Sequence, residues 1–148
     1  MKHIHISIER QTLQLKENHT LINEYIISSA KNGIGSSEGS YCTPIGKFFV
    51  DEKHGYNAPP YTIFKSRQPQ KIWDKTQTNE DLILSRILWL QGCSVDNANT
   101  KQRYIYIHGT NHEDLLGTPH SCGCIRMATK DVIELYEKVS IGTSVTIE

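Results

Sequence analysis

The stretch Met1-Lys2-His3-Ile4-His5-Ile6-Ser7-Ile8-Glu9-Arg10 alternates polar and apolar side chains from its first residues. Because successive side chains of a strand point to opposite faces, Ile4, Ile6 and Ile8 would share one face. The stretch lacks the continuous apolar run of a secretory signal peptide. It therefore predicts a half-buried strand at the start of the chain. It also favours a cytoplasmic location, with a periplasmic one if a leader has been removed.

Similar patterns recur along the chain and predict further short strands. The expected strands lie within residues 13–15, 21–27, 48–50, 82–90, 104–108 and 144–147. Tight turns between the first of them are typical of an antiparallel meander. Apolar positions recur at helical spacing only over residues 129–139, with Thr129 as the expected N-cap. The sequence thus predicts a mainly β fold with about one helix.

Two segments interrupt the strand pattern. Residues 32–46 are rich in glycine, but they contain neither a Gly-x-Gly-x-x-Gly nor a Walker A pattern, so nucleotide binding is not predicted. Residues 53–81 are polar and contain three prolines, and we interpret them as a long surface loop. Loops of that length in a compact domain usually act as lids or binding loops.

Length and charge restrict the class of protein. The 148 residues are enough for one domain, so we expect a single domain over residues 1–148. The 16 basic residues balance the 16 acidic ones, which argues against a nucleic-acid partner. No apolar run approaches the roughly 18 residues of a membrane span.

Reactive side chains are concentrated in two short segments. Tyr106-Ile107-His108-Gly109-Thr110 is a strand that ends in a histidine, and Ser121-Cys122-Gly123-Cys124-Ile125-Arg126-Met127 is a turn before the helix. A neighbouring imidazole can take the proton of a cysteine thiol, and backbone N–H groups of a tight turn can bind an oxyanion. From spacing alone, a buried thiol with a structural histidine at a strand end is the commoner interpretation.

Two other interpretations also remain open from the residues. A zinc cluster is one, although the spacing of its candidate ligands matches no common zinc motif. Those candidates are His108, His112, His120, Cys122 and Cys124. The other is a non-catalytic wall-binding module, with Trp73, Trp89 and the tyrosines as a sugar platform, although aromatics at strand spacing are more often core. We expect no cofactor and no metal.

Several separated motifs, in consistent order, resemble the L,D-transpeptidase (YkuD) family over nearly the whole chain. They are Ser29-Ala30-Lys31-Asn32-Gly33-Ile34-Gly35, Glu38-Gly39-Ser40, Thr43-Pro44-Ile45-Gly46-Lys47-Phe48, residues 83–90, residues 103–107, His108-Gly109-Thr110, Gly117-Thr118-Pro119 and Ser121-x-Gly123-Cys124-Ile125-Arg126-Met127. The resemblance implies a YkuD-like β-sandwich whose helix follows the catalytic cysteine. It identifies Cys124 as the nucleophile and His108 as its base.

The resemblance also implies a substrate and a reaction. Family members attack the carbonyl of the L-centre of the diamino acid at position three of a peptidoglycan stem tetrapeptide. They expel the terminal D-Ala and leave a thioester, which water or an amine resolves. Without a leader, the chain would meet soluble muropeptides, and hydrolysis as an L,D-carboxypeptidase is expected. The alternative is an exported L,D-transpeptidase that forms 3-3 cross-links. Carbapenem-type β-lactams are the expected inhibitors.

The family pattern assigns the remaining roles by position. The backbone N–H groups of Cys122, Gly123 and Cys124 are the expected oxyanion donors, and the Gly109 carbonyl is expected to orient His108. Arg126 is expected to bind a substrate carboxylate, with a structural ion pair as the alternative. Ser121 and Tyr106 are also expected to contact the substrate.

The chain departs from the family pattern at Cys122, which replaces the motif histidine. His108 is still the expected base, because His120 lies out of register, while loss of activity is the alternative. If Cys124 is a partly exposed thiol of low pKa, Cys122 could resolve its oxidised form through a disulfide. The competing interpretation is that Cys122 only fills the space of the absent histidine.

Overall fold

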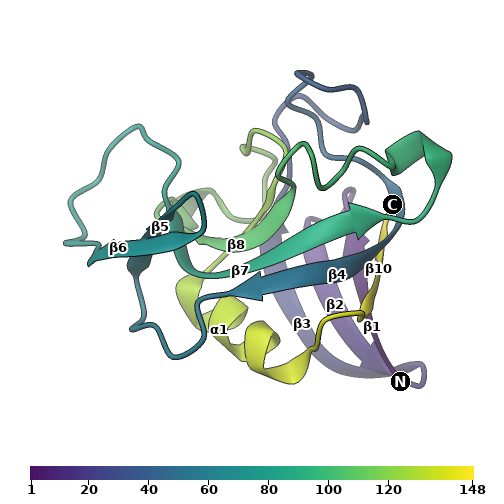
Figure 1. Ribbon diagram of the computed structural model, residues 1–148, viewed down its shortest axis with the longest axis horizontal. Helices are drawn as coiled ribbons and strands as arrows, with labels where there is room; N and C mark the ends of the chain where they lie inside the picture. The colour runs from purple at the N-terminus through teal and green to yellow at the C-terminus, as the bar shows by residue number, and fades with distance from the viewer.

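The computed structural model describes all of residues 1–148 and is built from short strands with one α-helix (Figure 1). The strands are β1 (Lys2–Ser7), β2 (Thr12–Glu17), β3 (Thr20–Ser28), β4 (Gly46–His54), β5 (Thr62–Lys65), β6 (Gln68–Ile72), β7 (Ile83–Gly92), β8 (Tyr106–Thr110), β9 (Ile125–Met127) and β10 (Ser144–Ile147). Helix α1 spans Thr129–Lys138, and short 3-10 helices span Val95–Asn97 and Glu113–Leu115. The predicted mainly β fold with one helix after the cysteine is confirmed.

The strands form one mixed sheet that folds back on itself. Their order is β4-β10-β1-β2-β3-β9-β8-β7-β5-β6, and β4 also pairs with β7. This second pairing of β4 closes the sheet into a β-sandwich-like fold, from which the β5–β6 hairpin projects (Figure 1). The expected antiparallel meander is present as β1, β2 and β3. Two pairs are parallel, β1 with β10 and β8 with β9.

Alternating apolar residues fill the space inside the folded sheet. Ile4 and Ile6 of β1 pair in register with Leu15 and Leu13 of β2, and all four are fully buried. They belong to one cluster of 20 buried residues that reaches across to β7, β8 and α1. Burying these side chains is the main favourable term for folding, at roughly 25 cal/mol per Å² of apolar surface.

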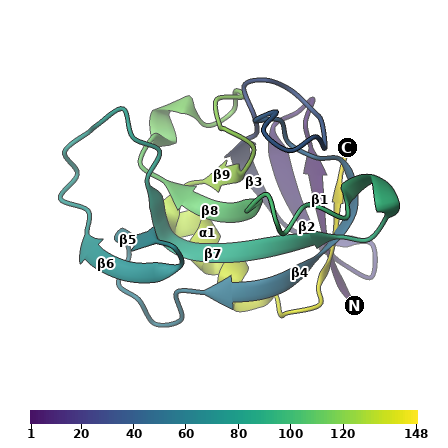
Figure 2. The same ribbon diagram turned by 45° about the horizontal axis from the view of Figure 1, so that its top comes forward.

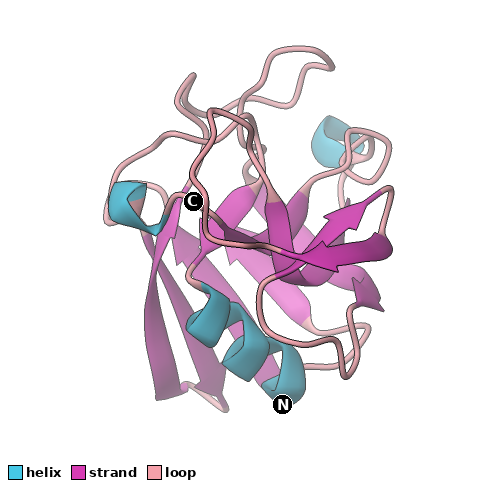
Figure 3. Ribbon diagram, turned by 90° about the vertical axis from the view of Figure 1, so that its left-hand side faces the viewer, coloured by secondary structure: helices cyan, strands magenta, loops and turns pink.

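Helix α1 packs against β7 and β8 along one side of the sheet (Figure 3). Val132, Leu135 and Tyr136 recur on its buried face, as the spacing predicts. The predicted N-cap is wrong, because Ala128 holds that position. The Thr129 hydroxyl instead meets Ser85 Oγ on β7 at 2.9 Å. At ten residues α1 is the longest helix, and the structure contains none long and apolar enough to cross a membrane.

The segment expected to be a long surface loop is only partly a loop. Strands β5 and β6 form a hairpin within it, and β5 pairs with β7. Ile63 and Phe64 of β5 are buried, so apolar contacts anchor the hairpin. These contacts were not predicted, because residues 53–81 are polar in overall composition. The remaining residues 73–81 form an excursion beyond β6 (Figure 1).

Strand β9 brings the two reactive segments together. It lies between β3 and β8, and its parallel register sets Arg126 opposite His108 (Figure 2). On the other side of β8, Gly109 pairs with Leu84 of β7. A Cβ atom on Gly109 would lie 2.5 Å from the Leu84 carbonyl oxygen, so only glycine permits this close approach of the strands.

Candidate active site

The turn over residues 121–124 is held by hydrogen bonds within itself and from the glycine-rich loop. The Ser121 hydroxyl donates to the Cys124 carbonyl at 2.6 Å and accepts from the Gly123 N–H at 3.2 Å. Gly123 has a φ of 130°, a region that favours glycine. The Thr43 hydroxyl donates to the Gly123 carbonyl at 2.9 Å and also accepts from the Ala30 N–H. These contacts fix the backbone that presents Cys124.

Cys124 carries a half-buried thiol held between two backbone groups that flank Ile105. The Tyr106 N–H donates to its sulfur, and the thiol donates to the Tyr104 carbonyl, both at 3.3 Å. Burial raises the pKa of this thiol to about 12, and the nearby charge of Asp81 adds to the increase. The expectation of a low-pKa thiol is therefore wrong. Cys124 is protonated at neutral pH in this structure and needs a base.

His108 is buried at the end of the strand beside the cysteine. Its Nδ1 lies 2.7 Å from the Gly109 carbonyl oxygen, the contact that the sequence predicts. Burial lowers the pKa of His108, so the ring is neutral at neutral pH, although Asp81 opposes this shift. A carbonyl can only accept, so the proton must sit on Nδ1. The Nε2 lone pair, which makes no hydrogen bond to the protein, is then free to accept one.

The base lies on β8, and the nucleophile lies in the turn just before the neighbouring strand β9. Tyr106, whose N–H meets the sulfur, precedes His108 by two residues and so shares its face of β8. No hydrogen bond joins His108 to Cys124 in this structure. The thiol faces Tyr104 instead. Catalytic contacts are often long or absent in free enzymes and form only when the substrate binds, so this geometry is compatible with His108 as the base.

Of the three expected oxyanion donors, two are available. The backbone N–H groups of Cys122 and Cys124 make no hydrogen bond to the protein. The Gly123 N–H already donates to the Ser121 hydroxyl. The turn therefore leaves two backbone donors without a protein partner, one of them on the nucleophile itself, and such donors can stabilise a tetrahedral oxyanion.

The three expected substrate contacts have other partners. Arg126 is buried, and its Nη2 lies 3.1 Å from Asp81 Oδ2, which is the ion pair named as the alternative. Its Nε is buried without a partner. The Ser121 hydroxyl is buried and used inside the turn. The ring of Tyr106 is buried against Trp89, and its hydroxyl accepts a hydrogen bond from Arg67 at 3.1 Å.

Four residues that the sequence analysis did not single out also support the site. Thr43 ties the glycine-rich loop to the turn, and Arg103 donates to the Cys42 carbonyl at 2.7 Å and to that of Gly35. Thr43 lies inside a motif already quoted for the family, so its signal was present. Asp81 and Arg67 lie in the polar segment, where nothing in the sequence distinguishes them from solvated charges.

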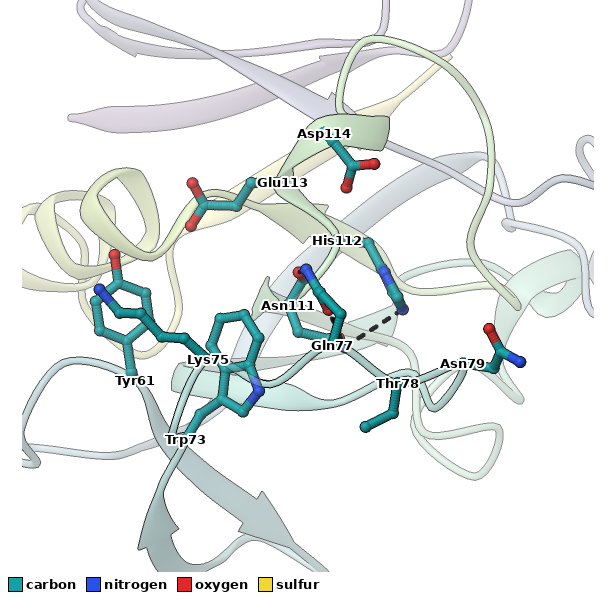
Figure 4. Close-up of a pocket in the computed structure, with 10 residues that line it drawn as sticks. All are labelled: Tyr61, Trp73, Lys75, Gln77, Thr78, Asn79, Asn111, His112, Glu113 and Asp114. Carbon is teal, nitrogen blue, oxygen red and sulfur yellow. Dashed lines mark hydrogen bonds between the residues drawn. The ribbon is translucent and has the colours of Figure 1, made fainter.

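Hollows lie on both sides of the cysteine–histidine pair. One of about 300 Å³ is lined by Cys122 and Tyr104, and by Glu38, Gly39 and Tyr41 of the glycine-rich loop, among others. A larger one of about 690 Å³ lies at the far end of β8 (Figure 4). Its walls carry Tyr61, Trp73, Lys75, Gln77, Thr78, Asn79, Asn111, His112, Glu113 and Asp114. None of the residues expected for catalysis or substrate binding lines this larger cavity, whereas Trp73 and His112 from the two alternative interpretations do.

The structure does not favour the two alternative interpretations, a zinc cluster and a sugar-binding platform. No three His, Cys, Asp or Glu side chains gather where they could hold a metal ion. The tryptophans are separated as well. Trp89 is buried against Tyr104 and Tyr106, whereas Trp73 contacts Tyr61 beside the larger cavity. No common aromatic platform is formed.

Comparison with known sequences gives a match over almost the whole chain. The family model of the L,D-transpeptidase catalytic domain, YkuD, matches residues 1–147. The protein YkuD of Bacillus subtilis (strain 168) is 42% identical over 86 residues, covering 52% of this chain and 48% of that protein. YqjB of the same strain is 42% identical over 52 residues, covering 35% and 30%. The matches span about half the length of these relatives or less.

Comparison with solved structures shows the same fold at low sequence identity. An L,D-transpeptidase from Mycobacterium smegmatis superposes with a TM-score of 0.66 at 15% identity, covering 99% of this chain and 58% of that one. L,D-transpeptidase 3 from Mycobacterium tuberculosis gives 0.64 at 15% identity, with 99% and 60% covered.

Fold and site together define a β-rich domain with a histidine on β8 and a cysteine in the turn that leads into the adjacent parallel strand β9. The match over residues 1–147 identifies the family, and the chain belongs to the L,D-transpeptidase (YkuD) catalytic-domain family.

Proposed function

We propose that this protein is a cysteine acyl-transfer enzyme that acts on the tetrapeptide stems of peptidoglycan or of muropeptides. The observation that carries the proposal is the state of His108. Its Nδ1–H is held by the Gly109 carbonyl, and its Nε2 is free beside the strand that leads from Cys124. A protonated thiol next to a neutral imidazole with a free lone pair suits general-base catalysis.

In the proposed reaction, the Cys124 thiol proton passes to His108 Nε2 as the sulfur attacks the carbonyl carbon of the position-three L-centre. The N–H groups of Cys122 and Cys124 donate to the oxyanion that forms. The imidazolium then returns the proton to the departing nitrogen of D-Ala as the C–N bond breaks. A thioester on Cys124 remains.

We propose that water resolves the thioester, which releases a tripeptide and restores the thiol. This outcome is the L,D-carboxypeptidase reaction and goes with a cytoplasmic location. Transpeptidation to an amine is the second candidate, and it is favoured by the names of the solved relatives.

The test is mass spectrometry of a disaccharide tetrapeptide incubated with the protein, with and without an amine acceptor. Loss of D-Ala alone supports hydrolysis, and a product joined to the amine supports transpeptidation. Cys124→Ala should abolish turnover, because loss of a nucleophile removes several powers of ten in rate. Cys122→Ala is the matched control and should keep most of it. An active Cys124→Ala variant would refute the assignment.

We further propose that carbapenem-type β-lactams acylate Cys124. Related solved structures support this, since they include a complex with imipenem, a faropenem-derived adduct and an avibactam carbamoyl enzyme. The expected result is a mass adduct on the wild-type protein that is absent from Cys124→Ala.

Fractionation of cells that express the full natural gene would test the proposed cytoplasmic location.

A further inference from the structure

The turn of the β5–β6 hairpin places a positive charge against Trp89 and Tyr106, two members of the apolar cluster that Cys124 packs against. Ser66 and Arg67 form this two-residue turn, with φ of 48° and 62°. Turns of this shape favour Asn-Gly, because other residues are strained at positive φ. Here the turn holds a long charged side chain, so the position of Arg67 is maintained against a local conformational cost.

The Arg67 guanidinium rests on the aromatic residues that hold the thiol. Its Cζ lies 4.6 Å from the centre of the Trp89 ring and 5.7 Å from that of Tyr104. Its Nη1 donates to the Tyr106 hydroxyl at 3.1 Å. Tyr106 also donates its backbone N–H to Cys124 Sγ, so a single tyrosine contacts both the guanidinium and the nucleophile.

Most of the hydrogen-bonding capacity of Arg67 is unused. A guanidinium has five N–H donors, and the Tyr106 hydroxyl is the one protein acceptor that Arg67 meets. None of the ion pairs of the protein includes Arg67. Its side chain is half-exposed and so accessible to a ligand.

The other cationic side chains near the site already have acidic or carbonyl partners. Arg126 is buried and paired with Asp81. Lys101 also lies over the Trp89 ring, at 4.9 Å, but Asp51 and Glu52 both bind its Nζ. Arg103 donates to backbone carbonyls of the glycine-rich loop.

We propose that Arg67 binds a carboxylate of the donor stem peptide and so selects which carbonyl reaches Cys124. This inference rests on the proposed function and names its specificity residue. A stacked guanidinium with parallel free donors suits a planar carboxylate. One source is the terminal D-Ala carboxylate, one residue or roughly 3.5 Å beyond the attacked carbonyl. The other is a side-chain carboxylate on the position-three diamino acid.

The test compares enzyme and substrate changes in one cycle. The first substrate is a tetrapeptide with a free terminal carboxylate and a side-chain carboxylate on its position-three residue. The second is the same peptide with a terminal amide. The third keeps the free terminal carboxylate but has lysine at position three, which lacks the side-chain carboxylate. The enzymes are the wild type, Arg67→Gln, Arg67→Lys and Lys101→Gln. Arg67→Gln should lower kcat/KM about ten- to a hundred-fold on the peptide that carries the recognised carboxylate, the range expected for a charged hydrogen bond.

The same variant should have little effect on the peptide that lacks that carboxylate, which identifies the source. Arg67→Lys should give an intermediate loss, because it keeps the charge without the fork. Lys101→Gln removes the other cation over Trp89 and should leave the selectivity unchanged. Equal loss by Arg67→Gln on all three peptides would show a structural role and overturn the inference. A wild type that turns over no stem and forms no thioester would instead refute the proposed function itself.

Discussion

At the scale of single residues, the protonation states of His108 and Cys124 determine how the site can work. A thiol whose pKa is raised to about 12 is not a preformed thiolate at neutral pH. His108 is neutral, with its proton directed to the Gly109 carbonyl. The pair therefore starts as thiol and imidazole, and the proton has to move during the attack rather than before it.

This starting state predicts the pH dependence of kcat/KM. His108 acts as a base only when neutral, and burial lowers its pKa below the ordinary 6.5, so activity should fall only as the pH drops through that lowered value. No decline should occur up to about pH 9, since the thiol stays protonated. Asp81→Asn should move the acid limb to lower pH, because Asp81 raises the pKa of His108. A midpoint at or above 6.5 would contradict this prediction.

The same thiol state predicts the order of alkylation. The thiolate is the species that reacts with iodoacetamide, so a thiol of raised pKa reacts slowly. Cys93 and Cys122 are exposed, whereas Cys124 is half-buried. Peptide mapping during a time course at pH 7.5 should show Cys93 and Cys122 modified before Cys124. If Cys124 is modified first, the thiol is more acidic than this structure indicates, and oxidation resolved by Cys122 becomes the better account.

At the scale of elements, the glycine-rich loop and the catalytic turn act as one unit through Thr43. Its buried hydroxyl bridges the Gly123 carbonyl and the Ala30 N–H. Thr43→Val leaves both backbone groups unpaired and should lower the free energy of unfolding by about 1–3 kcal/mol. It should also reduce kcat/KM, because the turn then loses its support. Urea denaturation and turnover measure the two effects.

Thr43→Ser is the matched control for that change. It keeps the hydroxyl and loses only a methyl group, so it should retain both hydrogen bonds and most of the activity. If Thr43→Val keeps its stability and activity while Thr43→Ser loses them, the methyl group rather than the hydroxyl supports the turn.

Local pattern predicted the elements whose burial alternates regularly. The strands β1, β2 and β10 and helix α1 show this clearly, because one face of each is buried in the main core. The β5–β6 hairpin was missed, because β6 is exposed along its whole length and contains Pro69, so only contacts with β7 reveal it. Cys124 and His108 came from motif resemblance. Arg67 and Asp81 could not be predicted, since their role depends on the fold that places them.

At the scale of the whole molecule, the fold depends on the closure of the sheet by its last strand. β10 lies between β1, its parallel partner, and β4, its antiparallel partner. β4 continues the sheet to β7, which carries β8 and thus His108. The C-terminal strand therefore joins the N-terminal meander to the strands of the site, and its packing should affect the stability of the entire sheet.

Ile147 of β10 tests this dependence. Its side chain is fully buried in the main core, whereas Thr146 on the same strand is partly exposed on the other face. Ile147→Ala leaves a cavity and should cost about 2–5 kcal/mol, which is a large fraction of the stability of a domain this size. Thr146→Ala should cost much less. Urea denaturation followed by tryptophan fluorescence, which reports on Trp89 beside the site, should show one transition that moves to lower urea. Two separate transitions, with only one of them shifted, would show that the meander and the site strands fold independently of β10.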